Sequence, residues 1–477
     1  MNAHHDFVIL GSGSTAFAAA LKGAEMGARV LMVEQSHLGG TCVNWGCIPS
    51  KTLIHEADEY YSAVRTKPYG VNLTAGPIEC PLLMTAKKKA VEKVRREHYQ
   101  AVIDDEPRIE VQRGHGRFIS PHELQVGADV VVAGKFLIAV GGVPRTLRLP
   151  GITEVDYLTS YSAMHLPCFP ESMVIIGGGV IALEMGQMFQ RFGTRVTILE
   201  RGERPLKDFD PRLTEILRQC LENEGLNMEF GVETQRVFRD GEDSCIVARV
   251  GGTEREFRAE RIMFAIGTAP ATADIGLIEA GVRTGAAGFI QVDEEMRTTT
   301  ANIWAAGDVT GPPLIAPAGE REGEVAAENM LNSEAHRRID HRQTPMGVFV
   351  HPELANVGLS TAAAEAEGKE VVETFFDLDR VPKAHVMGGR RGGIVLTAER
   401  GSGRILGVQM LMPRAADIIH EAAMAVKFGL SVFDMVDLVH VYPTISDGLR
   451  QAMSENVRQQ KQLEDKLATT RFSGKAD

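Results

Sequence analysis

A strand–turn–helix–strand pattern occurs twice in this sequence, and each copy ends in a glutamate. In the first copy the apolar run Phe7–Leu10 leads into a turn with Gly11, Gly13 and Ala16, and a second apolar run ends in Glu34. Glycines in such a turn let the backbone approach a pyrophosphate at a helix N-terminus, and the carboxylate can bind a ribose. The pattern predicts a βαβ unit, and hence an α/β fold, that binds a dinucleotide.

The second copy lies near the middle of the chain, with Gly177 and Gly179 in its turn and Glu200 at its end. Two copies predict two dinucleotide sites, and the second is most simply a nicotinamide site. Glu200 favours a free 2′-hydroxyl and hence NADH, whereas Arg201 and Arg204 could hold the 2′-phosphate of NADPH. The sequence leans toward NADH and leaves NADPH open.

Two cysteines, Cys42 and Cys47, follow the first dinucleotide pattern closely. On the first turns of a helix their sulfurs could meet at disulfide distance, and the helix dipole would favour a thiolate. Pro49 is tolerated near a helix start, and Lys51 adds a nearby cation. The spacing favours a redox-active pair over the alternative of a structural disulfide or two unrelated buried thiols.

The other four cysteines lie far apart in the sequence and lack metal-ligand spacing. We therefore expect them to be small buried apolar residues. They are Cys80, Cys168, Cys220 and Cys245.

Length and charge limit the class of protein further. The 477 residues allow roughly two to four domains. The net charge of −12 argues against a nucleic-acid or anionic-membrane partner, and the run Lys87–Lys89 is expected to be one solvated helix face. The longest apolar stretch is interrupted by glycines and Glu184, so no membrane span is expected. The first strand begins near Met1, which leaves no room for a secretory signal and predicts a cytoplasmic protein.

The segment Gly39–Lys51 reads Gly-Gly-Thr-Cys-Val-Asn-Trp-Gly-Cys-Ile-Pro-Ser-Lys. It closely resembles the redox-active segment of the flavin-dependent pyridine nucleotide-disulfide oxidoreductases, which include dihydrolipoyl dehydrogenase, glutathione reductase and mercuric reductase. The resemblance implies FAD at the first dinucleotide site and NADH or NADPH as the electron donor at the second. It also implies that electrons reach Cys47, nearest the flavin, and then Cys42, the exchange thiol.

Other segments carry the same resemblance. Glu184 matches the family glutamate that pairs with the lysine of the redox helix, here Lys51, and Asp308 matches the aspartate that binds the FAD ribityl chain. The strand ends at Gly141 and Gly267 resemble the two crossings between the FAD and NAD domains. The cofactor contacts implied in this way are Gly11, Gly13, Ala16, Glu34, Gly40, Thr41, Lys51, Gly141, Gly177, Gly179, Glu200, Arg201, Gly267 and Asp308.

The resemblance gives a division of the chain into domains. Residues 1–150 and 271–338 are expected to form the FAD-binding domain and residues 151–270 the NAD(P)-binding domain, both Rossmann-like. Residues 339–460 resemble the family's α+β dimerisation domain, which implies a homodimer, and residues 461–477 form a C-terminal tail.

The end of the dimerisation domain departs from the disulfide reductases, which carry His-x-His-Pro-Thr-x-x-Glu there. In this sequence Tyr442 replaces the second, catalytic histidine and Asp447 the glutamate that orients it, whereas His440 keeps the first histidine position. A tyrosine with a pKa of about 10 is a poor proton shuttle compared with a histidine of about 6.5. Reduction of an organic disulfide is therefore disfavoured, with His440 left as a less suitable base.

Two tyrosines make mercuric reductase the most similar branch. Mercuric reductases carry a tyrosine at the position of Tyr442 and another in a helix after the redox cysteines, which Tyr99 matches. A soft metal ion held by two thiolates needs no leaving-group proton. We expect Cys42 and Cys47 to bind Hg(II) transiently, as substrate, and Tyr99 and Tyr442 to assist its reduction to Hg(0).

One feature opposes this assignment. Mercuric reductases end in a vicinal cysteine pair that takes up the metal, but the tail Lys461–Asp477 has no cysteine, and no small metal-binding domain precedes the reductase region. The alternatives are a disulfide reductase for an unidentified thiol, a quinone or dye reductase, and a non-enzymatic redox sensor; the two complete dinucleotide sites argue against the sensor.

Overall fold

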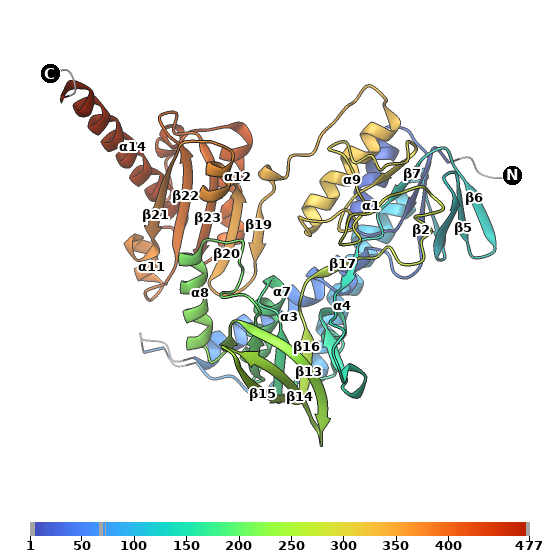
Figure 1. Cartoon of the computed structure of the whole chain (residues 1–477), viewed down its shortest axis with the longest axis horizontal. Helices are drawn as coiled ribbons and strands as arrows, with labels where there is room; N and C mark the ends of the chain where they lie inside the picture. The colour runs from blue at the N-terminus through green and yellow to red at the C-terminus, as the bar shows by residue number, and fades with distance from the viewer. Residues whose placement is uncertain (1–4, 66–69, 72, 474–477) are drawn as a thin grey trace.

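The computed structural model describes residues 5–65, 70–71 and 73–473. Three lobes lie around a common centre (Figure 1): an N-terminal lobe, a middle lobe and a C-terminal lobe. Each lobe is built on a five-stranded sheet. The predicted α/β fold with two Rossmann-like units and a C-terminal α+β region is confirmed.

The N-terminal lobe contains a fully parallel sheet with the strand order β18-β7-β1-β2-β3. All four residues of its central strand β1 are buried, as expected for a strand covered on both faces. Helix α1 (Ser14–Glu25) packs against α9 (Ala316–Leu331). The strands are β1 (Phe7–Leu10), β2 (Val30–Glu34), β3 (Ile109–Arg113), β7 (Phe136–Ile138) and β18 (Ile303–Ala305).

Strand β18 shows that the chain leaves this lobe and returns to it. It pairs in parallel with β7, and Trp304 lies opposite Leu137. The middle lobe is therefore an insertion between two parts of the N-terminal lobe. The individual boundaries at residues 150, 270, 338 and 460 stay predictions.

The middle lobe repeats the parallel arrangement in a sheet of order β12-β11-β10-β16-β9. An antiparallel sheet of β13, β14 and β15 packs beside it, and an antiparallel pair of β8 (Gly142–Pro144) and β17 (Thr268–Pro270) lies at the crossings between the lobes. The other elements are β9 (Tyr157–Thr159), α6 (Ser160–Ala163), β10 (Ser172–Ile176), α7 (Val180–Arg191), β11 (Arg195–Leu199), α8 (Pro211–Asn223), β12 (Asn227–Glu229), β13 (Val232–Asp240), β14 (Asp243–Val250), β15 (Thr253–Ala259) and β16 (Arg261–Phe264).

The C-terminal lobe has an antiparallel sheet of order β19-β20-β23-β22-β21. Strand β23 is buried along its whole length, and helices α12 and α14 contribute to the same core. The elements are β19 (Met346–Val348), β20 (Glu353–Gly358), α10 (Thr361–Ala366), β21 (Val371–Asp377), α11 (Pro382–Val386), β22 (Gly393–Glu399), β23 (Ile405–Met412), α12 (Ala415–Phe428), α13 (Val432–Val436) and α14 (Asp447–Ser473).

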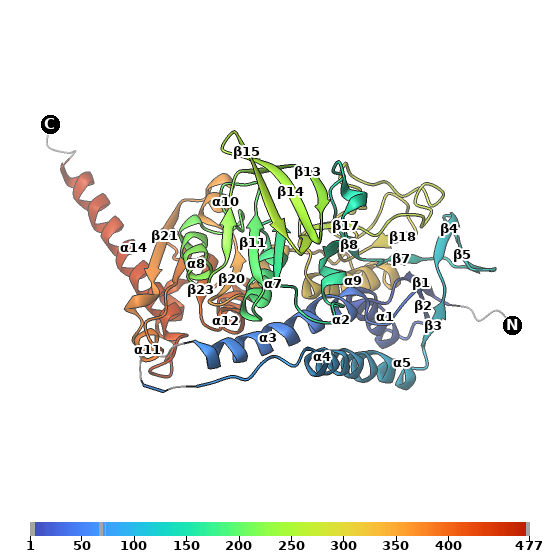
Figure 2. The ribbon, with the colours of Figure 1, turned by 90° about the horizontal axis from the view of Figure 1, so that it is seen from below.

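Helices after the first dinucleotide turn connect the lobes. Helix α3 (Cys47–Val64) and helix α4 (Cys80–Arg95) run side by side along the lower edge of the molecule as drawn in Figure 2. One apolar core joins α3 and α7 with residues of the C-terminal sheet, including Leu354 and Leu411. Short elements complete the chain: α2 (Gly40–Asn44), a π-helical turn η1 (Arg96–Gln100), α5 (Ala101–Asp105), β4 (Gly116–Ser120), β5 (Glu123–Val126), β6 (Asp129–Val132), η2 (Ile152–Glu154), η3 (His341–Gln343) and η4 (Leu378–Arg380).

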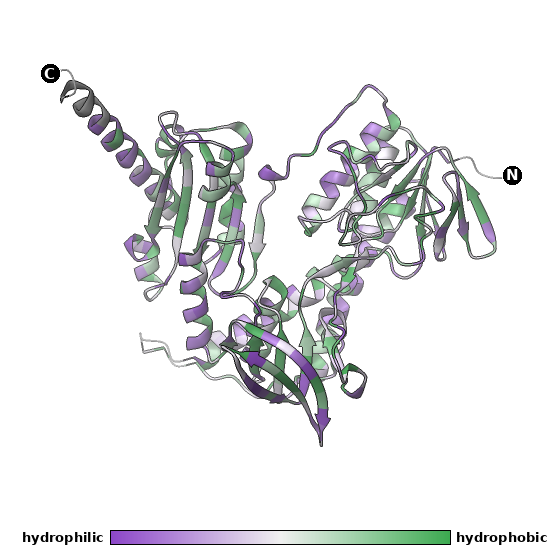
Figure 3. Ribbon diagram, viewed as in Figure 1, coloured by the Kyte–Doolittle hydropathy of each residue, from purple (hydrophilic) through white to green (hydrophobic). Residues whose placement is uncertain are grey.

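The last part of α14 projects away from the body (Figure 1), and its residues up to Lys466 are mainly hydrophilic (Figure 3). The predicted tail is helical up to Ser473, and its residues 474–477 lie outside the described part of the chain. Among the described residues, no helix is both long and apolar enough to span a membrane. The cytoplasmic location stays a prediction.

Two expectations about side chains were wrong. Cys80 and Cys168 form a disulfide, with Cα atoms 5.2 Å apart, because folding places both on the face of the middle lobe where α4 packs. Lys87 is buried and donates a hydrogen bond to the carbonyl of Met164, so Lys87–Lys89 is not one solvated face. Successive helical residues point about 100° apart, which separates Lys87 from its exposed neighbours. Cys245 is buried as expected, whereas Cys220 is only half-buried.

The same steric constraint shapes both dinucleotide turns. Gly11 has φ +117° and Gly177 has φ +115°. A Cβ atom on Gly11 would lie 2.3 Å from the carbonyl oxygen of Ala139, and one on Gly177 would lie 2.4 Å from that of Ala265. Only glycine fits at these positions, because the obstructing atoms belong to backbone of the neighbouring parallel strand ends.

We predict that Gly177→Ala destabilises the protein far more than Gly193→Ala. Gly193 has φ +97° with no atom near its Cβ position, so that variant carries the backbone strain of about 1 kcal/mol without the clash. The measurement is the midpoint of thermal unfolding of each purified variant. Equal midpoints would show that the close approach of the Ala265 carbonyl does not restrict which residue can occupy position 177.

Candidate active site

A large cavity of about 1130 Å³ lies where the N-terminal and middle lobes meet and extends to residues of the C-terminal lobe. It brings together most of the site residues predicted from the sequence. Those that line it are Gly11, Gly13, Glu34, Gly40, Thr41, Cys42, Cys47, Lys51, Gly141, Glu184, Gly267 and Asp308. The predicted residues outside its lining are Ala16, Tyr99, Gly177, Gly179, Glu200, Arg201 and Tyr442.

The redox segment spans the short helix α2 and the start of the longer helix α3 rather than a single helix. Cys42 lies in α2, and Cys47 is the first residue of α3, so the predicted common helix was wrong while the helix-start position of Cys47 was right. The carbonyl of Thr41 accepts hydrogen bonds from the backbone N–H groups of Trp45 (2.9 Å) and Gly46 (2.7 Å). This tight reversal brings the two thiols into hydrogen-bond contact.

The two cysteines have opposite electrostatic properties. The hydrogen bond from Cys42 lowers the pKa of Cys47 to about 7, and the positive charge of Lys51 acts in the same direction. The same hydrogen bond and burial raise the pKa of Cys42 above its ordinary range. Cys47 is therefore the thiolate of the pair at neutral pH, and Cys42 is the thiol that donates to it.

The predicted contact between Lys51 and Glu184 is present. Lys51 Nζ lies 2.6 Å from Glu184 Oε2, and the Glu184 side chain is 5% exposed. The other carboxylate oxygen accepts a hydrogen bond of 2.9 Å from the backbone N–H of Phe349, whose ring lies 4.8 Å from Lys51 Nζ. A buried carboxylate needs such partners, and here both of its oxygens have one.

Two aromatic residues at the site were not predicted from the sequence. The hydroxyl of Tyr161 lies 2.8 Å from Thr41 Oγ1 and donates to the carbonyl of Gly142 at 3.0 Å, and its ring stacks on Trp45 at 5.8 Å between centroids. Burial raises the pKa of Tyr161. Trp45 lies within the redox segment, so its position in the sequence could have indicated a place at the site. No sequence pattern indicated Tyr161, since 120 residues separate it from Thr41.

The part of the cavity next to the first turn fits FAD. Glu34, at the end of β2, accepts a hydrogen bond of 2.6 Å from Ser12 Oγ. A Cβ atom on Gly40 would lie 2.7 Å from the Cα of Gly13, so the redox segment packs directly against the dinucleotide turn. Burial raises the pKa of Asp308 in the cavity wall to about 6. A glycine turn at the start of α1, a ribose-binding carboxylate and a buried aspartate form a suitable donor and acceptor set for this cofactor.

The second turn fits a nicotinamide nucleotide. Of the two arginines that could bind a 2′-phosphate, one already donates hydrogen bonds to protein atoms. Glu200 follows β11 directly and packs so closely on the turn that a Cβ atom on Gly178 would lie 2.8 Å from its Cγ. The guanidinium of Arg204 donates to the carbonyl of Phe209 (2.8 Å) and to Thr214 Oγ1 (3.2 Å), which holds the loop before α8. Arg201 is exposed.

Tyr99 lies close to the cysteine pair although it does not line the cavity. It sits in the π-helical turn η1, with its ring 4.6 Å from that of Phe17. Burial is the main cause that raises the Tyr99 pKa, and electrostatic interaction with the cysteine pair acts in the same direction. Arg95 just before this turn donates to Asn44 Oδ1 at 3.2 Å, which ties the turn to the redox segment.

Tyr442 lies elsewhere on the same chain, in an exposed loop before α14. Its side chain is 70% exposed. His440 Nε2 lies 2.9 Å from Glu421 Oε1, and Asp447 accepts hydrogen bonds from Arg450 (2.7 Å) and Gln451 (2.6 Å). These three residues therefore do not form a site within one chain.

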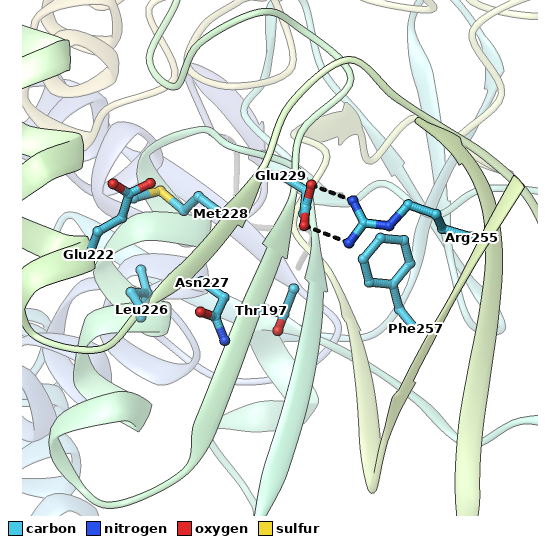
Figure 4. A pocket seen from close by; sticks show the side chains of 8 residues that line it. All are labelled: Thr197, Glu222, Leu226, Asn227, Met228, Glu229, Arg255 and Phe257. Carbon is cyan, nitrogen blue, oxygen red and sulfur yellow. Dashed lines mark hydrogen bonds and ion pairs between the residues drawn. The ribbon is translucent and has the colours of Figure 1, made fainter. Parts of the chain in front are cut away.

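A second hollow of about 460 Å³ lies on the middle lobe (Figure 4). Arg255 closes one side of it with two hydrogen bonds of 2.8 Å to Glu229, and the Arg255 guanidinium lies 5.0 Å from the Phe257 ring. In the described part of the chain, the two cavities share no lining residue, and no cluster of three potential metal-ligating side chains occurs. The large cavity is the candidate active site.

We predict that the thiolate of Cys47 in the reduced protein forms with a midpoint near pH 7. Replacing Cys42 by alanine removes the hydrogen bond that stabilises it, so the midpoint should rise toward the ordinary value of about 8.5. The measurement is the pH dependence of alkylation of Cys47 followed by peptide mapping, with Cys220→Ala as the control. A midpoint that is unchanged in Cys42→Ala would contradict the assigned cause.

Comparison with known proteins identifies the family of this chain. Residues 5–326 match the pyridine nucleotide-disulphide oxidoreductase family, and residues 344–453 match the dimerisation domain of that family. A mercuric reductase from Staphylococcus aureus is 37% identical over 449 residues, which cover 94% of this chain and 82% of the relative. A dihydrolipoyl dehydrogenase from Thermus scotoductus is 33% identical over 451 residues, or 94% and 96% of the two chains.

Solved structures give the same result. The HOCl-induced flavoprotein disulfide reductase RclA from Escherichia coli is 27% identical with a TM-score of 0.83, and the match covers 94% of this chain and 99% of that one. A Cu(II) complex of the same reductase matches with a TM-score of 0.83. The chain belongs to the pyridine nucleotide-disulphide oxidoreductase family, whose members contain FAD and use NAD(P)H.

Proposed function

We propose that this protein is an NAD(P)H-dependent flavoenzyme of the mercuric reductase type, which reduces Hg(II) to Hg(0) at Cys42 and Cys47. The observation that supports it best is a pair of adjoining thiols in the cavity wall, with Tyr99 beside them and Tyr442 in place of a catalytic histidine. The mercuric reductases among its relatives, at 34–37% identity, support the same assignment.

The chain's own residues would prepare the thiol pair for this reaction. Cys47 is the thiolate at neutral pH, and Lys51 stabilises its charge. Glu184 fixes the ammonium group of Lys51 and is itself fixed by the N–H of Phe349. FAD, when held by the turn glycines, Glu34 and Asp308, would supply transfer of an electron pair from the nicotinamide to the cysteines.

Two thiolates suit Hg(II), because soft sulfur ligands bind soft metal ions strongly. Loss of the Cys42 proton on metal binding would give the second sulfur ligand, and Tyr99, in the turn that Arg95 ties to the redox segment, would assist. Tyr442 would contribute in a homodimer, at the cavity of the other subunit, since it is exposed and outside the cavity of its own chain.

A disulfide reductase is the second candidate function, and one side chain favours it. Such a reaction needs a proton donor for the leaving thiolate. Glu320 of α9 lines the cavity with Cys42, and burial raises the pKa of its carboxyl group. The dihydrolipoyl dehydrogenase and RclA relatives agree with this alternative. Transfer of electrons to a quinone or dye would need neither cysteine.

We predict that the FAD-loaded enzyme oxidises NADH in the presence of Hg(II) and excess thiol, and that Cys42→Ala abolishes this activity. The reason is that one remaining thiolate cannot both hold the metal and receive the electron pair. The measurement is steady-state oxidation of the nucleotide, with Cys220→Ala as a matched control. Cys42-dependent turnover of lipoamide or glutathione disulfide without any mercury response would replace the proposal by the disulfide reductase.

We further predict that kcat/KM for NADH exceeds that for NADPH. The Glu200 carboxylate would repel a 2′-phosphate, and Arg204 is engaged with its own loop. Glu200→Ala should lower the ratio of kcat/KM for NADH to kcat/KM for NADPH. Glu203→Ala, which removes a neighbouring exposed carboxylate, should leave this ratio unchanged. A wild-type preference for NADPH would show that Arg201 dominates this site.

A further inference from the structure

A second cysteine pair lies outside the cavity. Cys80 is the first residue of α4, and Cys168 lies in the segment that follows α6, 88 residues later in the sequence. Their Cα atoms are 5.2 Å apart, within the range of about 4.4–6.8 Å that a disulfide requires, and the structure has them bonded. Neither sulfur takes part in the function proposed above.

The two cysteine residues differ in their access to solvent. Cys168 is exposed, whereas Cys80 is 7% exposed and packs beside the first turn of α4. A small thiol or disulfide in solution can therefore reach Cys168, and Cys80 is positioned to resolve a mixed disulfide formed there. This division into an accessible and a resolving cysteine is typical of reversible thiol–disulfide sites.

The pair joins two elements that also meet through other contacts. Lys87, two turns along α4 from Cys80, is buried and donates to the carbonyl of Met164. Leu83 of α4 and Phe169 next to Cys168 pack on the same apolar core. The disulfide thus lies at the end of an existing contact between α4 and residues 164–169.

Both joined elements reach the redox segment at their other ends. Arg95 at the end of α4 donates to Asn44 Oδ1 at 3.2 Å. Tyr161 in α6 contacts Thr41 Oγ1 at 2.8 Å and stacks on Trp45. Helix α4 runs beside α2 and α3 (Figure 2), so the second pair is linked to the first along the length of α4 on one side and through Tyr161 on the other.

We propose that Cys80 and Cys168 are a reversible modification site for small organic disulfides, and that their bond holds α6 and its following segment in place against α4 beside the redox segment. The Cys168 thiolate attacks one sulfur of the organic disulfide and releases one thiol. The Cys80 thiolate then attacks Cys168 in the mixed disulfide and releases the second thiol. The protein pair loses two electrons and two protons, and the organic disulfide is reduced to two thiols. Excess thiol reverses both steps.

The bond links residues that are distant in sequence, so its loss should loosen the shorter of the two joined elements. Helix α6 has four residues, and Tyr161 joins it to the redox segment through a hydrogen bond with Thr41 and stacking on Trp45. The other hydrogen bond of Tyr161 goes to the carbonyl of Gly142, outside that segment. After reduction, the backbone N–H groups of residues 160–170 should open to solvent more often. The inference is independent of the electron acceptor proposed for Cys42 and Cys47.

The test uses the FAD-loaded, full-length protein, treated first with glutathione disulfide and then with excess glutathione. Three readouts are followed: peptide mapping of the Cys80–Cys168 linkage, hydrogen exchange of residues 160–170, and the thermal midpoint. We expect the linkage to form and to be reduced again, with slower exchange and a midpoint several degrees higher in the oxidised form. None of these readouts requires mercury or turnover, so their outcome does not depend on whether the proposed function is correct.

Variants separate this pair from Cys42 and Cys47, which the same reagents also oxidise. Cys168→Ser changes an exposed position and should abolish the oxidation-dependent differences in residues 160–170, and Cys80→Ala should do the same if it folds. Cys220→Ser is the matched control and should behave as the wild type. A linkage that never forms, one that excess glutathione cannot reduce, or protection of residues 160–170 that persists in Cys168→Ser would overturn the proposal.

Discussion

The buried carboxylate of Glu184 is the point at which the three lobes meet. It belongs to α7 of the middle lobe, accepts a charge-assisted hydrogen bond from Lys51 of the redox helix, and accepts a second from the N–H of Phe349 at the start of the C-terminal lobe. Burying a charge costs free energy unless its hydrogen-bond partners are in place. The lobes therefore cannot shift relative to one another without exposing this carboxylate or leaving it without a partner. The ammonium group that this carboxylate fixes is also the cation that favours the Cys47 thiolate. Lobe arrangement and thiol chemistry therefore depend on the same contact.

The difference in pKa between Cys42 and Cys47 arises from the local geometry of the redox segment. Two N–H groups share the carbonyl of Thr41, and the resulting turn lets the thiol of Cys42 donate to Cys47. The pKa of one sulfur is thereby lowered and that of the other raised, although both residues are half-buried. Tyr161 holds the Thr41 side chain from outside the turn, and through it the segment that carries Cys168 adjoins the redox site. A disulfide on the molecular surface and a dithiol in the cavity are thus parts of one packed unit.

Most of the fold and part of the candidate site could be predicted from the sequence. The turn glycines at 11 and 177, the strand-end glutamates and the spacing of Cys42 and Cys47 are short-range patterns, since the steric needs of a βαβ turn and of a thiol pair act within a few residues. Lys51 and Glu184 were paired through family resemblance, and the contact is present. The Cys80–Cys168 bond, the burial of Lys87 and the contact of Tyr161 with Thr41 were not predicted, because residues 77 to 120 positions apart form them.

The sequence by itself therefore determined the chemistry that this protein can carry: two dinucleotide turns, one redox cysteine pair and a tyrosine where a histidine would act as the acid. These features depend on residue type and local spacing, which folding does not alter. Only the tertiary structure decided which groups surround that chemistry. It engages the guanidinium of Arg204 with its own loop, places Glu320 in the cavity wall and leaves Tyr442 exposed outside the cavity of its own chain. The physical reason is that burial, hydrogen bonding and charge act through space, and packing of the three lobes sets which distant side chains come within reach.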